Sequence, residues 1–201
     1  MYAVSLVSGR VDKKGGLSKR TVLHMHRVLK RALSQAVKWG LLTKNPCDAV
    51  DNIPKPSNTE RLTLTAEEAL SLLDKLKDHR LYLPVLIAVT TGMRRGEILG
   101  LRWKDADLKK KRLYIRQIVI ETRQNGLEIK PPKTDSSSRT IALPQTTINA
   151  LNKYRAKQAK LYLQMGISLT PETMLFDKFS GLSVPNRLTV SYRAFIKSNG
   201  F

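Results

Sequence analysis

The stretch VTTGMRRGEILGLRW, residues 89–103, places two arginines directly after a Thr-Thr-Gly break that follows the apolar run LYLPVLIA. The run predicts a buried helix, and Gly92 can end it. Arg94 is then expected at the first turn of the next helix, where free backbone N–H groups and the helix dipole favour an anion. Glu97, three residues on, shares its face and can hold the guanidinium. A plain surface ion pair of Arg94 or Arg95 with Glu97 fits the same residues.

The charge of the chain is strongly basic. It has 201 residues with 36 Lys and Arg against 16 Asp and Glu, a net charge of +20. Such an excess attracts polyanions, so nucleic acid is the expected partner. No apolar run approaches the roughly 18 to 20 residues that span a bilayer, and the amino-terminal residues lack the basic region of a signal peptide. We expect no membrane association and a cytoplasmic, nucleoid-associated location.

Metal and cofactor sites are not indicated. The single cysteine, Cys47, excludes an internal disulfide and a cysteine-rich zinc site. His24 and His26 are two residues apart in a helical pattern, so their side chains are expected to point apart. We therefore expect neither a metal nor a cofactor.

Residues 18–39 form the first clear helical pattern, with Ser18 as N-cap and Gly40 at the exit. One apolar stripe, which includes Val22 and Leu29, is expected to be buried. No acidic residue lies between Lys19 and Lys38, so ion pairs within the helix cannot explain its charge. We expect these side chains to contact DNA phosphates, although a solvated basic face is the alternative. The candidates are Lys19, Arg20, Arg27, Lys30 and Arg31.

The composition also suggests a boundary. Residues 51–62, DNIPKPSNTERL, carry two prolines and no periodicity, which predicts a linker. Residues 1–50 are too few to form a domain alone, so we expect part of a larger helical domain. Residues 63–201 alternate helical patterns with strand and turn patterns. The expected class is mainly α with a small antiparallel β-hairpin or sheet, α+β.

Two motifs in order resemble a known family. TTGMRRGEILGLRWKDAD resembles the first signature box of the tyrosine recombinase, or phage integrase, family. PPKTDSSSRTIALP is similar to the family's second box, whose hairpin turn carries a catalytic lysine. Upstream, GLSKRTVLHMHRVLKRALSQAVKWGLLTKNP looks like the end of the family's helical core-binding domain. The resemblance implies an integrase-like catalytic domain preceded by part of a core-binding domain.

The resemblance also implies roles for single residues. Arg94 would hold the non-bridging oxygens of the scissile phosphate, with Glu97 as its support. Lys133 would be the general acid that protonates the departing 5′ oxygen. Taken alone, Lys133 is better explained as a flexible surface lysine in a Ser-rich turn, and it is the arginine motif upstream that favours the catalytic role. Arg95 and Arg139 are further expected DNA contacts.

The family's remaining parts are not matched. Its His-x-x-Arg box, its second His or Trp and its tyrosine nucleophile should follow the lysine, but all three histidines precede Arg94. Tyr192 fits a packing position in a helical pattern. We therefore expect a recombinase fragment that binds duplex DNA and is inactive and monomeric alone. The complete protein would cut and rejoin strands through a phosphotyrosyl intermediate, as a tetramer in the synapse.

Two other functions compete with this hypothesis. A non-catalytic DNA-binding regulator on a decayed integrase scaffold would keep the basic charge and lose the chemistry. A basic RNA-binding protein is disfavoured, because only 6% of the residues are aromatic and no strand resembles a stacking surface.

Overall fold

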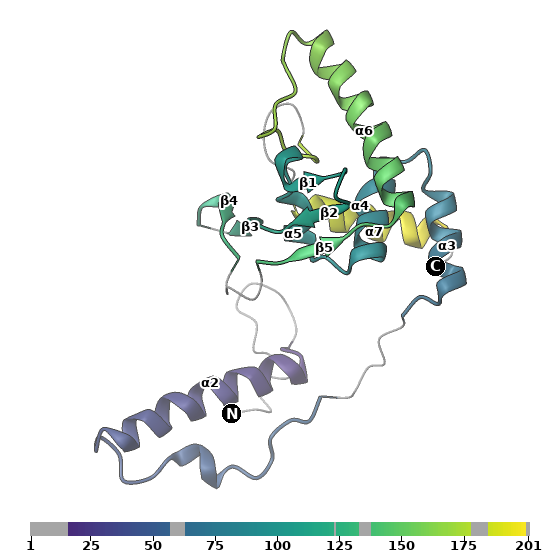
Figure 1. Cartoon of the computed structure of the whole chain (residues 1–201). Coiled ribbons are helices and arrows are strands. Elements are labelled where there is room, and N and C mark those ends of the chain that lie inside the picture. The colour runs from purple at the N-terminus through teal and green to yellow at the C-terminus, as the bar shows by residue number, and fades with distance from the viewer. Residues whose placement is uncertain (1–15, 57–62, 123, 133–137, 178–184, 200–201) are drawn as a thin grey trace. The chain divides into compact units, whose positions relative to one another are not determined.

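The computed structural model describes residues 16–56, 63–122, 124–132, 138–177 and 185–199 (Figure 1). The chain divides into two compact units, Met1–Thr63 and Leu64–Phe201. None of the helices in these described ranges is both long and apolar enough to cross a membrane.

The described residues of the first unit contain helix α2, Lys19–Lys38, and the 3-10 helix η1, Pro46–Ala49. Ser18 caps α2 by accepting from the Thr21 N–H, and Gly40 ends it in the left-handed conformation, as expected. The buried stripe is narrower than predicted: Val22 and His26 are buried, whereas Leu29 is exposed. The reason is that, in the described part of this unit, only the segment around η1 packs against α2.

The second unit holds the other helices of the described residues, whose bounds follow the sequence patterns closely. They are α3 (Ala66–Lys75), α4 (Tyr82–Thr91), α5 (Arg95–Leu99), η2 (Trp103–Asp105), α6 (Gln145–Gln164) and α7 (Pro185–Ser198). Thr65 and Glu68 form the predicted capping box of α3. Gly92, with φ of 65°, ends α4 and turns the chain into α5. The long helix α6 extends away from the sheets (Figure 1).

Among the described residues, five short strands form two antiparallel sheets. They are β1 (Ala106–Asp107), β2 (Arg112–Tyr114), β3 (Ile118–Thr122), β4 (Gly126–Lys130) and β5 (Thr140–Ala142). The orders are β1-β2-β5 and β3-β4. The expected class, mainly α with small antiparallel sheets, is confirmed. One detail differs from the prediction: β4 and β5, which flank the lysine segment, do not pair with each other, because β4 pairs with β3 and β5 with β2.

Helix α5 lies directly against strand β3 because Gly96 faces this strand and Gly100, the C-cap of the helix, faces the residue before it. A Cβ atom on Gly96 would come within 2.7 Å of the Val119 carbonyl oxygen, and one on Gly100 within 2.7 Å of the Gln117 carbonyl oxygen. The Gln117 side chain also donates to the Gly100 carbonyl, 2.9 Å away. Fully buried side chains complete the core around this contact: Ile87, Leu99, Leu101, Leu113, Ile115, Leu151 and Leu175. The start of α5 is therefore held on a rigid base.

Candidate active site

Arg94 is the N-cap residue of α5, immediately after the left-handed turn at Gly92. Its backbone N–H donates to Glu97 Oε2 at 2.8 Å, and its guanidinium Nη1 donates to Glu97 Oε1 at 3.1 Å. The Arg94 side chain is 75% exposed, whereas that of Glu97 is only 4% exposed. The predicted ion pair thus holds the Arg94 side chain in place through one guanidinium nitrogen. Much of the guanidinium stays exposed, where a ligand can bind it.

Glu97 also binds a second arginine. Arg139, just before β5, donates from Nη1 to Oε1 at 3.1 Å and from Nη2 to Oε2 at 3.0 Å. Burial raises the pKa of Glu97, but the donors from Arg139 and Arg94 outweigh it and hold the pKa below its usual range. Glu97 is therefore ionised at neutral pH. The sequence predicted that Arg139 contacts DNA. In the structure its guanidinium instead forms hydrogen bonds with the Glu97 carboxylate.

The other two site residues predicted in the second unit, Arg95 and Lys133, are not seen to join the Arg94–Glu97 pair. Arg95 is exposed, and its guanidinium donates to Thr189 and Asn186 at the start of α7. Lys133 lies outside the described residues. The strands on either side of its segment belong to different sheets, so the segment connects two sheets instead of closing a hairpin.

The basic residues of α2 belong to the first unit. Lys19, Arg20, Arg27, Lys30 and Arg31 are all exposed. Lys30 differs from the expectation of an unpaired basic face, because its ammonium lies 2.7 Å from the Asp48 carboxylate in η1. This acidic partner comes from outside the helix, where the spacing within the helix gave no sign of it.

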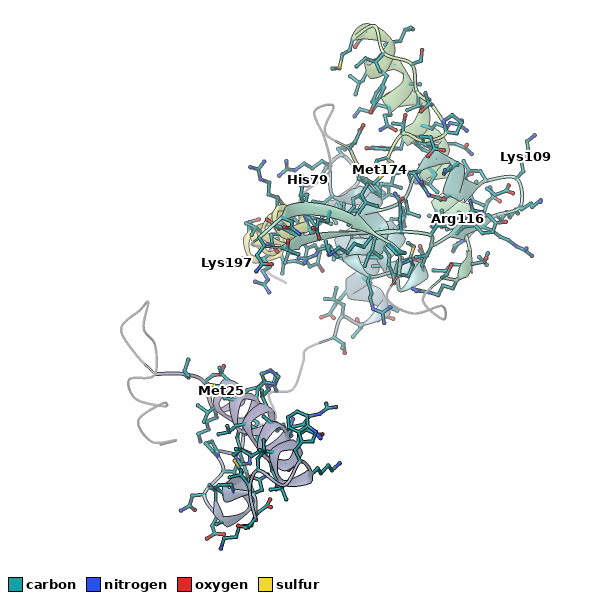
Figure 2. The ribbon with its side chains drawn as sticks, turned by 90° about the vertical axis from the view of Figure 1, so that its left-hand side faces the viewer. Met25, His79, Lys109, Arg116, Met174 and Lys197 are labelled. Carbon is teal, nitrogen blue, oxygen red and sulfur yellow. The ribbon has the colours of Figure 1, made fainter. Side chains whose placement is uncertain are left out.

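A second arginine–carboxylate pair repeats the local pattern of the first. Arg102 donates to Asp105, three residues on, from its backbone N–H at 3.2 Å and from Nε at 2.8 Å. Another arginine, Arg116, approaches the same carboxylate at 3.9 Å. Here, however, Arg102 is only 18% exposed and also contacts Glu172. Figure 2 labels Arg116 and also Met174, which forms a β-bridge with Arg102.

Four of the six tyrosines follow Arg94 in the sequence, and the side chain of each contacts other residues of the chain. Tyr114 lies under the Arg116 guanidinium, and Tyr162 donates to Asp177. Burial raises the pKa of Tyr154 to about 12 and also raises the pKa of Tyr192. Tyr192 packs against the cluster of Leu72, Leu76, Leu81 and Val85, as its helical pattern predicted. Raised pKa values are the opposite of what a nucleophile needs.

Metal ligands are not gathered in the part of the chain that the structure describes. No group of three or more His, Cys, Asp or Glu residues there is arranged to hold an ion.

A family model described as the phage integrase family matches residues 62–174, more than half of the 201-residue chain. The chain belongs to the phage integrase family. The matched residues include the two motifs described above, the one around Arg94 and Glu97 and the one around Lys133 and Arg139.

Curated members of the phage integrase family resemble the chain over most of its length. A "Tyrosine recombinase XerC-like" protein of Caldanaerobacter subterraneus subsp. tengcongensis is 35% identical over 164 residues, 75% of this chain and 42% of the relative. The ICEBs1 integrase of Bacillus subtilis is 27% identical over 81% of this chain and 44% of its own length. The chain thus spans less than half of the length of these curated relatives.

Solved structures of integrases share the fold. The Tn1549 transposon integrase in complex with transposon right end DNA has a TM-score of 0.70 and 26% identity, over 91% of this chain and 60% of that one. A lambda integrase dimer bound to a core site has a TM-score of 0.57 and 21% identity, over 91% of this chain and 46% of that one. The second comparison supports the fold alone.

Proposed function

We propose that this integrase-family chain is part of a site-specific DNA recombinase of phage or transposon type. It binds duplex DNA, and the complete protein cuts and rejoins strands through a phosphotyrosyl intermediate. The observation that carries this proposal is the exposed Arg94 guanidinium fixed by the buried carboxylate of Glu97. The DNA-bound Tn1549 integrase, at 26% identity, supports DNA as the partner.

Arg94 suits a phosphodiester by its chemistry. A guanidinium is planar and always charged, and it matches two phosphate oxygens with parallel hydrogen bonds. Held in place before the reaction, it stabilises the negative charge that grows on the phosphate in the transition state, which typically contributes about 3 kcal/mol. In this proposal Lys133 protonates the departing 5′ oxygen and Glu97 supports Arg94.

The domains divide the DNA contacts. Residues 1–50 are part of a helical DNA-binding domain, residues 51–62 are a linker, and residues 63–201 are the amino-terminal part of the catalytic domain. The basic residues of α2 contact phosphates outside the reacting site, and Arg95 adds a contact beside Arg94. The isolated chain is monomeric, and light scattering in solution would test this. The complete protein forms a tetramer in the recombination synapse and acts in the nucleoid.

The first test is duplex DNA binding by fluorescence anisotropy across a salt series. The logarithm of the affinity should fall against the logarithm of salt with a slope of about −0.9 per phosphate neutralised. Arg94→Gln should reduce the magnitude of that slope by about one. The control Arg116→Gln removes an equal charge from an exposed arginine that contacts Asp105 instead of Glu97.

Four results would contradict the proposal. A DNA affinity without measurable salt dependence would exclude the proposed contacts with DNA phosphates. Preference for single-stranded RNA over duplex DNA would favour an RNA-binding protein, and an Arg94→Gln variant with unchanged affinity would favour the regulator. A nicked duplex should form no covalent adduct with this chain, since tyrosines after Arg94 such as Tyr162 and Tyr192 are engaged by other residues of the chain. An adduct that survives denaturation would show a nucleophile that the proposal omits.

A further inference from the structure

Glu97 accepts four hydrogen bonds, which fill the lone pairs of a carboxylate. Oε1 accepts from Nη1 of Arg94 and Nη1 of Arg139, both at 3.1 Å. Oε2 accepts from the Arg94 backbone N–H at 2.8 Å and from Nη2 of Arg139 at 3.0 Å. The bidentate partner of Glu97 is therefore Arg139, and Arg94 contributes a single guanidinium nitrogen.

We infer that Arg139 is a positioning residue, which fixes Glu97 and through it aims Arg94, instead of a DNA contact in its own right. The inference rests on the proposed function, because the target of Arg94 is a DNA phosphate. The exposures agree with this division: the Arg139 side chain is 32% exposed, against 75% for Arg94.

The division of donors explains why a second arginine is useful. A buried carboxylate needs its charge balanced and its lone pairs satisfied. If Arg94 alone had to do this, its guanidinium would be drawn into a two-point contact with Glu97. Since Arg139 supplies that contact, Nε and Nη2 of Arg94 make no hydrogen bond to the described residues and stay available for phosphate oxygens.

Arg139 is itself anchored by the sheet. Its carbonyl oxygen accepts from the Ile115 N–H at 2.9 Å, and the neighbouring Ser138 hydroxyl donates to the Ile115 carbonyl at 3.3 Å. Glu97 lies on α5, one residue from the close contact of Gly96 with β3. The pair thus joins the β2–β5 sheet to the helix that carries Arg94.

The first experiment measures the clamp without DNA, by carbon-13 NMR titration of the Glu97 carboxyl group in the full chain. Arg139→Gln should raise the pKa of Glu97, because the largest of its lowering contacts is removed. Arg139→Lys should raise it less, since lysine keeps the charge but not the two parallel bonds. The control Arg116→Gln should leave it unchanged. An unchanged pKa in Arg139→Gln would overturn the inference.

The second experiment separates positioning from direct DNA contact by a double-mutant cycle on duplex DNA affinity. With Arg94 present, Arg139→Gln should weaken binding about fivefold more than Arg116→Gln does. In an Arg94→Ala background this excess should disappear, because nothing remains to be aimed. An equal excess loss in both backgrounds would mean that Arg139 contacts DNA itself and would overturn the inference.

The two proposals fail in different ways. If Arg94→Ala leaves DNA affinity unchanged, the proposed function fails, whereas the NMR titration still decides whether Arg139 holds Glu97. If Arg139→Gln does not fold, Arg139→Lys carries both tests. Its raised Glu97 pKa and its loss of affinity only where Arg94 is present would support positioning, and normal values of both would contradict it.

Discussion

At the scale of single residues, the chain contains two arginine–carboxylate pairs with one local geometry and two uses. Arg94 with Glu97 and Arg102 with Asp105 share the three-residue spacing and the backbone bond to the carboxylate. Their arginines differ in exposure, 75% against 18%. In the less exposed pair, Arg102 donates to protein carboxylates, so this pair stabilises the fold. In the more exposed pair, Arg94 keeps donors that can bind a ligand.

This difference predicts opposite effects of two alanine substitutions on stability. Arg102→Ala should lower the free energy of unfolding by about 2 kcal/mol, because it strips donors from the buried Asp105 carboxylate. Arg94→Ala should cost less than about 1 kcal/mol, since its side chain is mostly in solvent and Arg139 still holds Glu97. Urea unfolding of both variants measures the two costs. Equal costs would contradict the assignment of the two pairs.

The ionisation of Glu97 predicts a dependence of stability on acid. Its pKa in the folded chain lies below the ordinary value of 4.5, so its contribution is complete above that value and is lost as the pH falls through the folded pKa. Glu97→Gln removes this contribution and should flatten the loss of stability below about pH 4.5. Urea unfolding at a series of pH values tests this. An acid limb identical to that of the unmodified chain would show that Glu97 is not linked to folding.

At the scale of elements, α5 illustrates how tertiary contacts support a helix that could not form alone. It has only five residues, far below the length at which an isolated helix is stable. The approach of Gly96 and Gly100 to β3 and the bonds of Glu97 to Arg94 supply what length does not. The direction of the Arg94 side chain therefore depends on this packing.

Gly96→Ala tests that dependence. Its new Cβ would meet the Val119 carbonyl oxygen at 2.7 Å, a main-chain atom that cannot rotate away. We expect a loss of about 1 to 3 kcal/mol in unfolding free energy and a weaker affinity for duplex DNA. Gly166→Ala is the control: its left-handed backbone makes it costly, but its Cβ has no neighbour within 4 Å, so DNA affinity should persist. Normal DNA affinity in Gly96→Ala would contradict the link.

The elements also show where sequence reasoning works and where it ends. Helices α2 and α3 follow from caps and periodicity, which are local. The Arg94–Glu97 pair follows equally from a three-residue spacing. The pairing of β5 with β2 and the bond of Arg139 to Glu97 do not, because the latter joins residues 42 apart and no local pattern encodes a partner at that distance.

At the scale of the whole molecule, the two units are unequal in what they bury. Apart from the few buried residues near α2 and η1, all the buried apolar side chains of the described ranges lie in Leu64–Phe201, including both core clusters. In the first unit, Met25, Val28, Trp39 and Leu41 remain exposed. Cooperative stability should therefore reside in the second unit.

A division of the chain at its boundary tests this. The fragment 64–201 should unfold within about 4 °C of the full chain, since it retains the whole core. The fragment 1–63 should show weak helicity and no cooperative transition, because α2, the one α-helix among its described residues, has little packing and is marginal alone. Circular dichroism melts of the three chains provide the comparison. A much lower midpoint for the fragment 64–201 would mean that the first unit contributes to its core.

The left-handed turn at Gly92 has a consequence for how this stretch can change in length. A helix turns by about 100° with each residue, so one codon inserted between Arg94 and Glu97 would move the Arg94 guanidinium away from the face of α5 that carries Glu97. A codon inserted between β3 and β4 leaves the spacing of Arg94 and Glu97 unchanged, because it lies outside α5 and its N-cap. A single-codon insertion library scored for DNA binding should therefore lose its members at the first position and keep them at the second. The segment between Gly92 and Glu97 should therefore accept substitutions more readily than a change in its number of residues.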